Sequence, residues 1–89
     1  MRKVTLTAQF EKDVKRAKKR SYEMNKLSKA IRLLGQGDLE DRKYRHHPLK
    51  GKYEGLRECH LSPDWLLIYH SSIEQVLLVR TGTHTDLFR

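Results

Sequence analysis

The C-terminal half of the chain contains three β-rich segments joined by very short connections, and this arrangement limits the possible folds more than any other feature. We expect strands over about Tyr53–Leu61, Trp65–His70 and Ile73–Arg80. The connections Ser62-Pro63-Asp64 and Ser71-Ser72 have the length of hairpin turns. Because strands joined by hairpins run antiparallel, this half predicts a small antiparallel sheet.

The N-terminal half predicts a short strand followed by two amphipathic helices. Residues 4–6 alternate apolar and polar, as in a strand, and Thr7 is a suitable helix N-cap. A second helix begins at about Ser21 and ends at Gly35 and Gly37. The apolar positions at helical spacing are Phe10, Val14 and Ala17 in the first helix and Met24, Leu27, Ile31 and Leu34 in the second.

These elements predict one α+β domain over residues 1–89, in the order β-α-α-β-β-β. The length of 89 residues leaves no room for a second domain. We expect the two helices to form a hairpin that packs on one face of a mainly antiparallel sheet. Residues 38–52 are a charged connection between the two halves, too polar to be buried.

Positive charge is concentrated in the first half of the chain. Residues 1–52 carry sixteen basic and six acidic side chains, a net charge of +10, whereas residues 53–89 carry three basic and five acidic ones, a net charge of −2. A basic surface suits a polyanion such as RNA, DNA or a ribosome. The alternative is that lysine-rich helices only keep a small protein in solution.

The sequence predicts a cytoplasmic protein without a membrane segment, metal or cofactor. A single cysteine, Cys59, fits a reducing compartment, and no signal-like or membrane-spanning apolar run occurs. The spacings typical of zinc sites, C-x₂-C and H-x₃-H, are also absent. Cys59 and His60 are neighbours on a strand and therefore point in opposite directions.

Chemically capable side chains lie at the strand ends and turns of the second half. Glu58 and His60 should share one face of a strand, Asp64 follows the turn, and Arg80 ends the last strand before His84. Cleavage of RNA needs a base for the ribose 2′-OH, an acid for the departing oxygen, and cations for the phosphate, which these side chains could supply. Each one could instead be structural or solvated.

The sequence resembles the YafQ branch of the RelE/ParE superfamily, the toxin halves of bacterial type II toxin–antitoxin pairs. The similarity covers nearly the whole chain. It is densest in three blocks: His47-Pro48-Leu49 with Gly51; Gly55, Arg57-Glu58, His60 and Pro63-Asp64-Trp65; and Arg80-Thr81-Gly82-Thr83-His84 with Leu87-Phe88.

The resemblance implies a metal-independent endoribonuclease that cleaves mRNA on the ribosome by 2′-OH attack, leaving a 2′,3′-cyclic phosphate and a 5′-OH. It also implies a cognate antitoxin that masks the cationic surface, with operator DNA bound only through the toxin–antitoxin complex. The implied catalytic residues are His47, Glu58, His60, Asp64, Arg80 and His84, and the expected RNA contacts are Lys50, Trp65 and Phe88.

Several assignments stay open at this stage. His46 directly precedes His47, and we favour His47 because it carries the His-Pro-Leu context. We assign His60, paired with Glu58, to the base role and His84 to the acid role. Trp65 could equally be a core residue. The alternatives to a nuclease are a gyrase-poisoning toxin of the ParE type, which has no need of the histidines, and a non-catalytic nucleic-acid-binding module.

Overall fold

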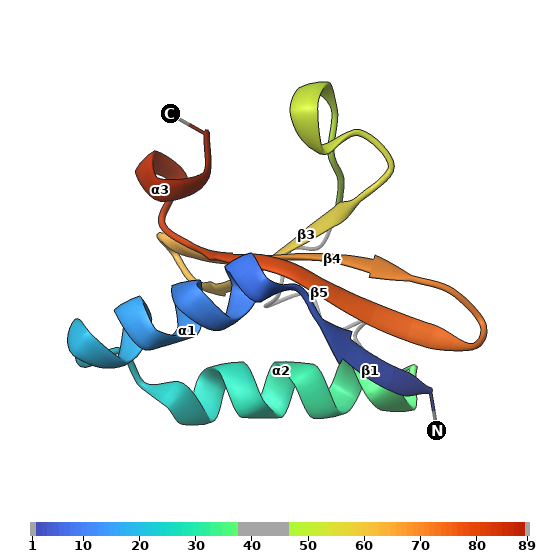
Figure 1. Cartoon of the computed structure of the whole chain (residues 1–89), viewed down its shortest axis with the longest axis horizontal. Coiled ribbons are helices and arrows are strands. Elements are labelled where there is room, and N and C mark those ends of the chain that lie inside the picture. The colour runs from blue at the N-terminus through green and yellow to red at the C-terminus, as the bar shows by residue number, and fades with distance from the viewer. Residues whose placement is uncertain (1, 38–46, 89) are drawn as a thin grey trace.

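One mixed β-sheet forms the centre of the protein (Figure 1), and the computed structural model describes residues 2–37 and 47–88 of the chain. Within those ranges the sheet has five strands in the order β1-β5-β4-β3-β2. Their bounds are β1 Lys3–Leu6, β2 His47–Pro48, β3 Arg57–Ser62, β4 Trp65–Ser71 and β5 Gln75–Gly82. β1 runs parallel to β5, and the other neighbours are antiparallel. The predicted α+β fold is therefore confirmed.

Two helices, α1 (Ala8–Lys19) and α2 (Met24–Gln36), cover one face of this sheet (Figure 1). The Thr7 hydroxyl accepts a hydrogen bond from the Phe10 amide at 2.9 Å, which is the predicted N-cap. α2 begins three residues later than expected because Ser21, at φ 61°, lies in the turn before it. Gly37, at φ 82°, ends α2, whereas Gly35 is a buried residue inside the helix.

The helical face contains the larger of the two hydrophobic clusters. Leu27, Ala30 and Leu34 of α2 are buried against β3, β4 and β5, and Met24 and Ile31 pack at the edge of the cluster. The apolar stripe predicted for the second helix is thus a core stripe. From the sheet, this cluster takes Cys59, Leu61, Trp65, Leu67, Tyr69, Val76 and Leu78.

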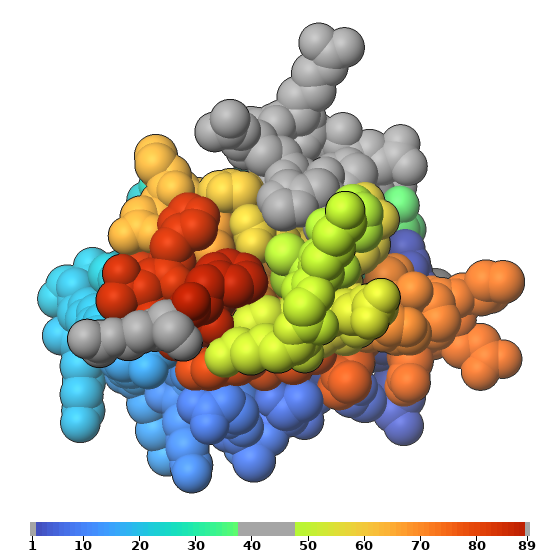
Figure 2. All heavy atoms as spheres, turned by 90° about the horizontal axis from the view of Figure 1, so that it is seen from above, coloured from blue at the N-terminus to red at the C-terminus, as the bar shows by residue number. Residues whose placement is uncertain are grey.

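The opposite face carries two short helical turns that the sequence analysis did not predict, η2 (Gly51–Tyr53) and α3 (His84–Phe88). They cover a smaller hydrophobic cluster made by Tyr53, Leu66, Ile68 and Leu87. Figure 2 shows α3 and the segment around η2 side by side above the sheet. The expected strand at Tyr53–Leu61 was wrong in its first half, because Gly55, at φ 89°, turns the chain and β3 begins only at Arg57.

A β-bulge in β5 decides which face Arg80 occupies. Tyr69 of β4 pairs with Leu78, but the preceding residue Ile68 pairs with Arg80, so Val79 is an extra residue in β5. Strict alternation from the core residue Leu78 would have placed Arg80 under the helices. The bulge instead puts Arg80 in the same cross-strand row as Ile68, on the face that carries α3.

Strand β5 also begins and ends two residues later than predicted, at Gln75 and Gly82. Ile73, which was expected to be its first residue, is 95% exposed at the tip of the β4–β5 hairpin. No helix within the described ranges is long and apolar enough to cross a membrane.

Candidate active site

The structure brings together two imidazoles that are twenty-four positions apart in the sequence. His60 lies on β3, and its cross-strand row continues through Leu66 of β4 to Gly82 of β5. Two residues beyond Gly82, His84 begins α3. As a result, the ring centroids of His60 and His84 lie 5.9 Å apart on the face opposite α1 and α2.

The side chain of Asp64, on the turn between β3 and β4, holds His84 by two contacts. Its Oδ1 accepts a hydrogen bond from the His84 backbone amide at 2.9 Å and lies 2.6 Å from Nδ1 of the His84 ring. These contacts, the backbone one first, lower the pKa of Asp64 below its ordinary value. Because an ionised carboxylate can only accept, Nδ1 is the donor, which leaves Nε2 of His84 for a substrate.

Helix α3, which carries His84, is held by a reciprocal cap, by Arg16 of α1 and by Arg20, the C-cap residue of α1. The Thr83 amide donates to Asp86 Oδ2 at 2.9 Å, and the Asp86 amide donates to the Thr83 hydroxyl at 3.1 Å. The Asp86 carboxylate also meets Arg20 at 2.8 Å and Arg16 at 3.7 Å. The hydrogen bond from Arg20 is the main reason why the pKa of Asp86 falls well below its ordinary value.

Glu58 and His60 share one face of β3, as period-two alternation requires. Glu58 Oε1 lies 3.6 Å from His60 Nε2, and the Glu58 side chain is only 5% exposed. Glu58 and His60 therefore form a second carboxylate–imidazole pair, more buried than Asp64 and His84. Cys59, between them in sequence, points into the core, where burial raises the pKa of its thiol to about 12, so it takes no part in the site.

Glu58, His60 and His84 could also hold a metal ion. One ligand atom from each lies within 4.8 Å of the others. The spacing rules used on the sequence do not detect such a group, because His84 reaches it from another strand end. Imidazole and carboxylate ligands of this kind suit zinc or copper.

Arg80 is positioned by a buried carboxylate of α1 that reaches round the edge of the sheet. Asp13, 1% exposed, accepts hydrogen bonds from Arg80 Nε and Nη2, both at 3.0 Å. It also accepts the Thr81 amide at 3.1 Å, at the edge of β5 beyond the end of β1. The paired carboxylate, with a further contribution from Tyr53, raises the pKa of Arg80 above its ordinary value.

Arg80 lies in the same cross-strand row as Glu58, with Ile68 of β4 between them. Because neighbouring strands are ~4.8 Å apart, the two backbones are separated by roughly 10 Å. The guanidinium of Arg80 itself is held by Asp13 at the outer edge of β5.

The two aromatic residues predicted to contact RNA have different surroundings. Phe88, 42% exposed, continues the row of rings on the α3 face, 6.3 Å from His84 and 5.5 Å from Tyr53. Trp65 is only 4% exposed and belongs to the core cluster of the helical face. Its Nε1 donates to the Thr81 hydroxyl at 2.9 Å, and Tyr22 packs on it with centroids 5.0 Å apart.

The remaining predicted residues lie at the edge of the site. Lys50 is exposed and immediately precedes η2. His47 pairs with Glu58 through the β2–β3 ladder, which extends the row of Glu58 and Arg80 by one strand. The structure describes the backbone of His47 but not its side chain, and His46 lies outside the described residues.

Comparison with known proteins identifies the family. The model of the family described as "Bacterial toxin of type II toxin-antitoxin system, YafQ" matches residues 2–89. The chain belongs to the YafQ family. It is 42% identical over 88 residues to the mRNA interferase toxin YafQ of Escherichia coli K12, which covers 98% of this chain and 96% of that protein.

Two solved structures of bacterial toxins agree closely with this fold. The E. coli DinJ–YafQ toxin–antitoxin complex matches with a TM-score of 0.92 at 42% identity, covering 99% of this chain and 98% of that one. A metal-bound toxin from Helicobacter pylori matches with a TM-score of 0.90 at 37% identity, covering 99% of this chain and 100% of that one.

Sequence reasoning missed three residues that position the site in this YafQ-family chain. Asp13 did not stand out among the many charged residues of a basic helix. Tyr53 was assigned to a strand, but its hydroxyl donates to the Leu87 carbonyl at 3.1 Å. Asp86 did have a signal, because Thr83-His84-Thr85-Asp86 is a capping-box pattern that predicts a helix start.

Proposed function

We propose that this protein is the toxin of a type II pair and that it acts as a metal-independent endoribonuclease on mRNA. The observation that carries the proposal is the His60–His84 pair, with ring centroids 5.9 Å apart and a carboxylate beside each ring. Membership of the YafQ family and the name of the E. coli relative, an mRNA interferase, support the same reaction.

In the proposed reaction His60 is the general base and His84 the general acid. His60, beside Glu58, takes the proton from a ribose 2′-OH, and that oxygen attacks the adjacent phosphorus. The bond to the 5′ oxygen then breaks, and Nε2 of His84 supplies the proton that this oxygen needs. The products are a 2′,3′-cyclic phosphate and a 5′-OH, so no water is consumed in the step.

The other side chains would hold the RNA and offset its charge. Arg80, whose guanidinium is fixed by Asp13, meets the charge that develops on the phosphoryl oxygens. Phe88 offers a half-exposed ring beside His84 on which an unpaired base can stack. Lys50 and the lysines of α1 would contact the flanking phosphates, and His47 would act from the row that it shares with Glu58.

The proposal includes partners and a compartment. A cognate antitoxin would bind the toxin, as DinJ does in the complex with E. coli YafQ. The complex, rather than the toxin alone, would then bind operator DNA. The substrate would be mRNA on ribosomes, which places the protein in the cytoplasm.

The first test is cleavage of a message on programmed ribosomes by the parent protein and by His60→Ala and His84→Ala. We expect each variant to lower the rate about 10²–10⁴-fold, the usual contribution of a positioned acid or base. His70→Ala is the matched control, because His70 is exposed on β4 and pairs with Leu77, outside the cross-strand rows of His60 and Glu58. The 3′ ends of the products should carry cyclic phosphate.

Variants that cleave as fast as the parent would contradict the assignment of the imidazoles. Growth arrest that persists in cells expressing His84→Ala without antitoxin would favour a gyrase-poisoning toxin instead.

Metal independence has its own test. We expect protein that has been stripped of metal with EDTA and then freed of the chelator to cleave at an unchanged rate, because both proton transfers use side chains. Added Zn²⁺ should inhibit, because it would ligate Glu58, His60 and His84 and remove their lone pairs from the reaction. Loss of activity in the stripped protein that returns when a transition-metal ion is restored to it, with the Mg²⁺ of the ribosomes left in place, would contradict the proposed mechanism.

A further inference from the structure

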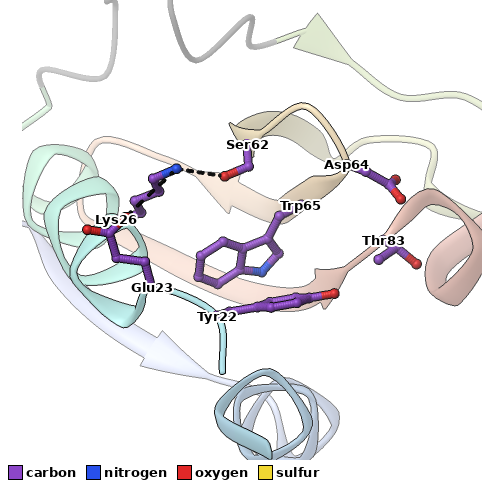
Figure 3. Close-up of a pocket in the computed structure, with 7 residues that line it drawn as sticks. All are labelled: Tyr22, Glu23, Lys26, Ser62, Asp64, Trp65 and Thr83. Atoms are coloured by element: carbon purple, nitrogen blue, oxygen red, sulfur yellow. Dashed lines mark hydrogen bonds and ion pairs between the residues drawn. The ribbon is translucent and has the colours of Figure 1, made fainter. Parts of the chain in front are cut away.

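A pocket of about 280 Å³ opens beside the imidazole pair, on the other side of the Asp64 turn. Figure 3 shows the rings of Tyr22 and Trp65 at its centre, with Lys26 and Glu23 on one side and Asp64 and Thr83 on the other. Ligand pockets in proteins begin at about 300 Å³, so this one is suited to a single small ring system.

The pocket shares Asp64 with the candidate active site. Asp64 lines the pocket and, through its Oδ1, also holds the His84 ring at 2.6 Å. Thr83, another lining residue, directly precedes His84 in the sequence. A strand whose scissile phosphate lies at the imidazoles would therefore pass its next nucleotide over this pocket.

The pocket offers aromatic surface, the carboxylates of Glu23 and Asp64, and one cation, Lys26, whose Nζ lies 3.9 Å from Glu23 Oε2. The polar edge of Trp65 is already used, because Nε1 donates to the Thr81 hydroxyl at 2.9 Å, so the indole presents carbon to an occupant. Tyr22 lies against it at an interplanar angle of 56°. Lys26 Nζ donates to the Ser62 hydroxyl at 3.0 Å along the edge of the pocket, where it can meet a base or its phosphate.

We propose that this pocket binds the unpaired base of the nucleotide next to the cleaved bond, packed against Tyr22 and Trp65 under the ammonium of Lys26. The inference rests on the proposed nuclease function and adds a subsite to it. An aromatic floor accepts any base, because every base has a π-face, so the pocket positions the strand rather than reading a sequence.

The test is a series of ribosome-bound messages in which one nucleotide at a time, on either side of the cleaved bond, is abasic. For the parent protein we expect one position adjacent to the cut at which loss of the base lowers kcat/KM about tenfold, the usual effect of one stacked base. We call the kcat/KM for the intact message divided by that for the abasic message the base ratio. In Tyr22→Leu and Lys26→Ala the base ratio should fall to about twofold or less. An abasic nucleotide can also change how the ribosome holds the message. This effect cancels when the parent and the variant are compared, because it is the same for both proteins.

Lys29→Ala is the matched control, since it removes the same charge from an exposed position of α2 that does not line the pocket. It should keep the tenfold ratio. Tyr22→Leu keeps an apolar side chain against the core. If the melting temperature of this variant is far below that of the parent, the result for Lys26→Ala alone tests the subsite. The proposed subsite is contradicted if Lys26→Ala keeps the tenfold base ratio. It is also contradicted if the parent protein shows no position adjacent to the cut at which loss of the base slows cleavage.

The two proposals fail differently. A parent protein that cleaves no message contradicts the nuclease function and this subsite with it. A parent that cleaves, and loses activity in His84→Ala, while the pocket variants keep the base ratio contradicts the subsite alone. Pocket variants that instead bind the antitoxin more than tenfold less tightly, with the ratio unchanged, would assign the pocket to the protein interface.

Discussion

The two faces of the sheet differ in what covers them and in what they can do. The face under α1 and α2 is filled by a continuous apolar cluster. The face under α3 has a smaller apolar cluster and, beside it, two histidines, Glu58 and Arg80. The comparison teaches that the helical face of this small domain is packed as a core, whereas the α3 face carries the ionisable side chains, buried Glu58 among them, on which the proposed chemistry depends.

The largest effect should come from the helical face. Leu78→Ala removes a side chain that is fully buried in the larger cluster, so we expect the free energy of unfolding to fall by about 2–5 kcal/mol. The rate of cleavage per folded molecule should stay within about twofold of the parent. Urea unfolding and a cleavage assay on the same preparation measure both. If Leu78→Ala lost its cleavage activity while its stability stayed unchanged, the separation between a stabilising face and a site face would be wrong.

A smaller and opposite effect is expected from Asp64→Asn on the site face. The amide oxygen can still accept from the His84 backbone, but the fixed charge beside the ring is lost, so we expect cleavage to slow about 10- to 100-fold. Stability should stay close to that of the parent, because the Asp64 side chain is 64% exposed. Glu74→Gln, on the β4–β5 hairpin, is the control that should change neither quantity.

The smallest effect concerns Asp86, which joins the two faces through Arg20. We expect Asp86→Asn to lower the free energy of unfolding by about 1 kcal/mol at pH 7, less at high salt because Arg20 is exposed. The pKa of Asp86 is lower in the folded protein, so its contribution is complete above the ordinary value of about 3.9. It is lost as the pH falls from there toward the folded value.

Urea unfolding at pH 7 and near pH 2 would measure this dependence for parent and variant. The difference between the two proteins should shrink at the lower pH. A difference that grows on acidification would show that the ionised form of Asp86 does not stabilise α3.

Local patterns in the sequence were enough to predict the helices, the hairpins and the shared face of Glu58 and His60. Each of these follows from a period of 3.6 or 2 residues, or from a cap such as Thr7, and depends on neighbours in the chain. The Asp64–His84 contact was expected only as a general convergence at strand ends, since its two residues come from different turns.

The features that could not be predicted depend on contacts between distant segments. The bulge at Val79 places Arg80 on the site face. The sequence around Val79 contains no glycine or other residue that would have marked a bulge there. The Asp13–Arg80 pair joins residues 67 positions apart, and nothing in either local sequence points to the other. Helix α3 was missed although its capping pattern is present, because five residues are too few for helical periodicity to be recognised.

The hydrogen bonds between Asp13 and Arg80 make the direction of the guanidinium that we propose to bind phosphate depend on the register of α1, a helix of the opposite face. Strand β1 leads directly into α1 through Thr7, so one residue inserted there would turn Asp13 by about 100° around the helix axis. The apolar stripe of α1 would turn with it and could repack, but the guanidinium would lose its anchor. The length of the first connection is thus a constraint on catalysis as well as on folding.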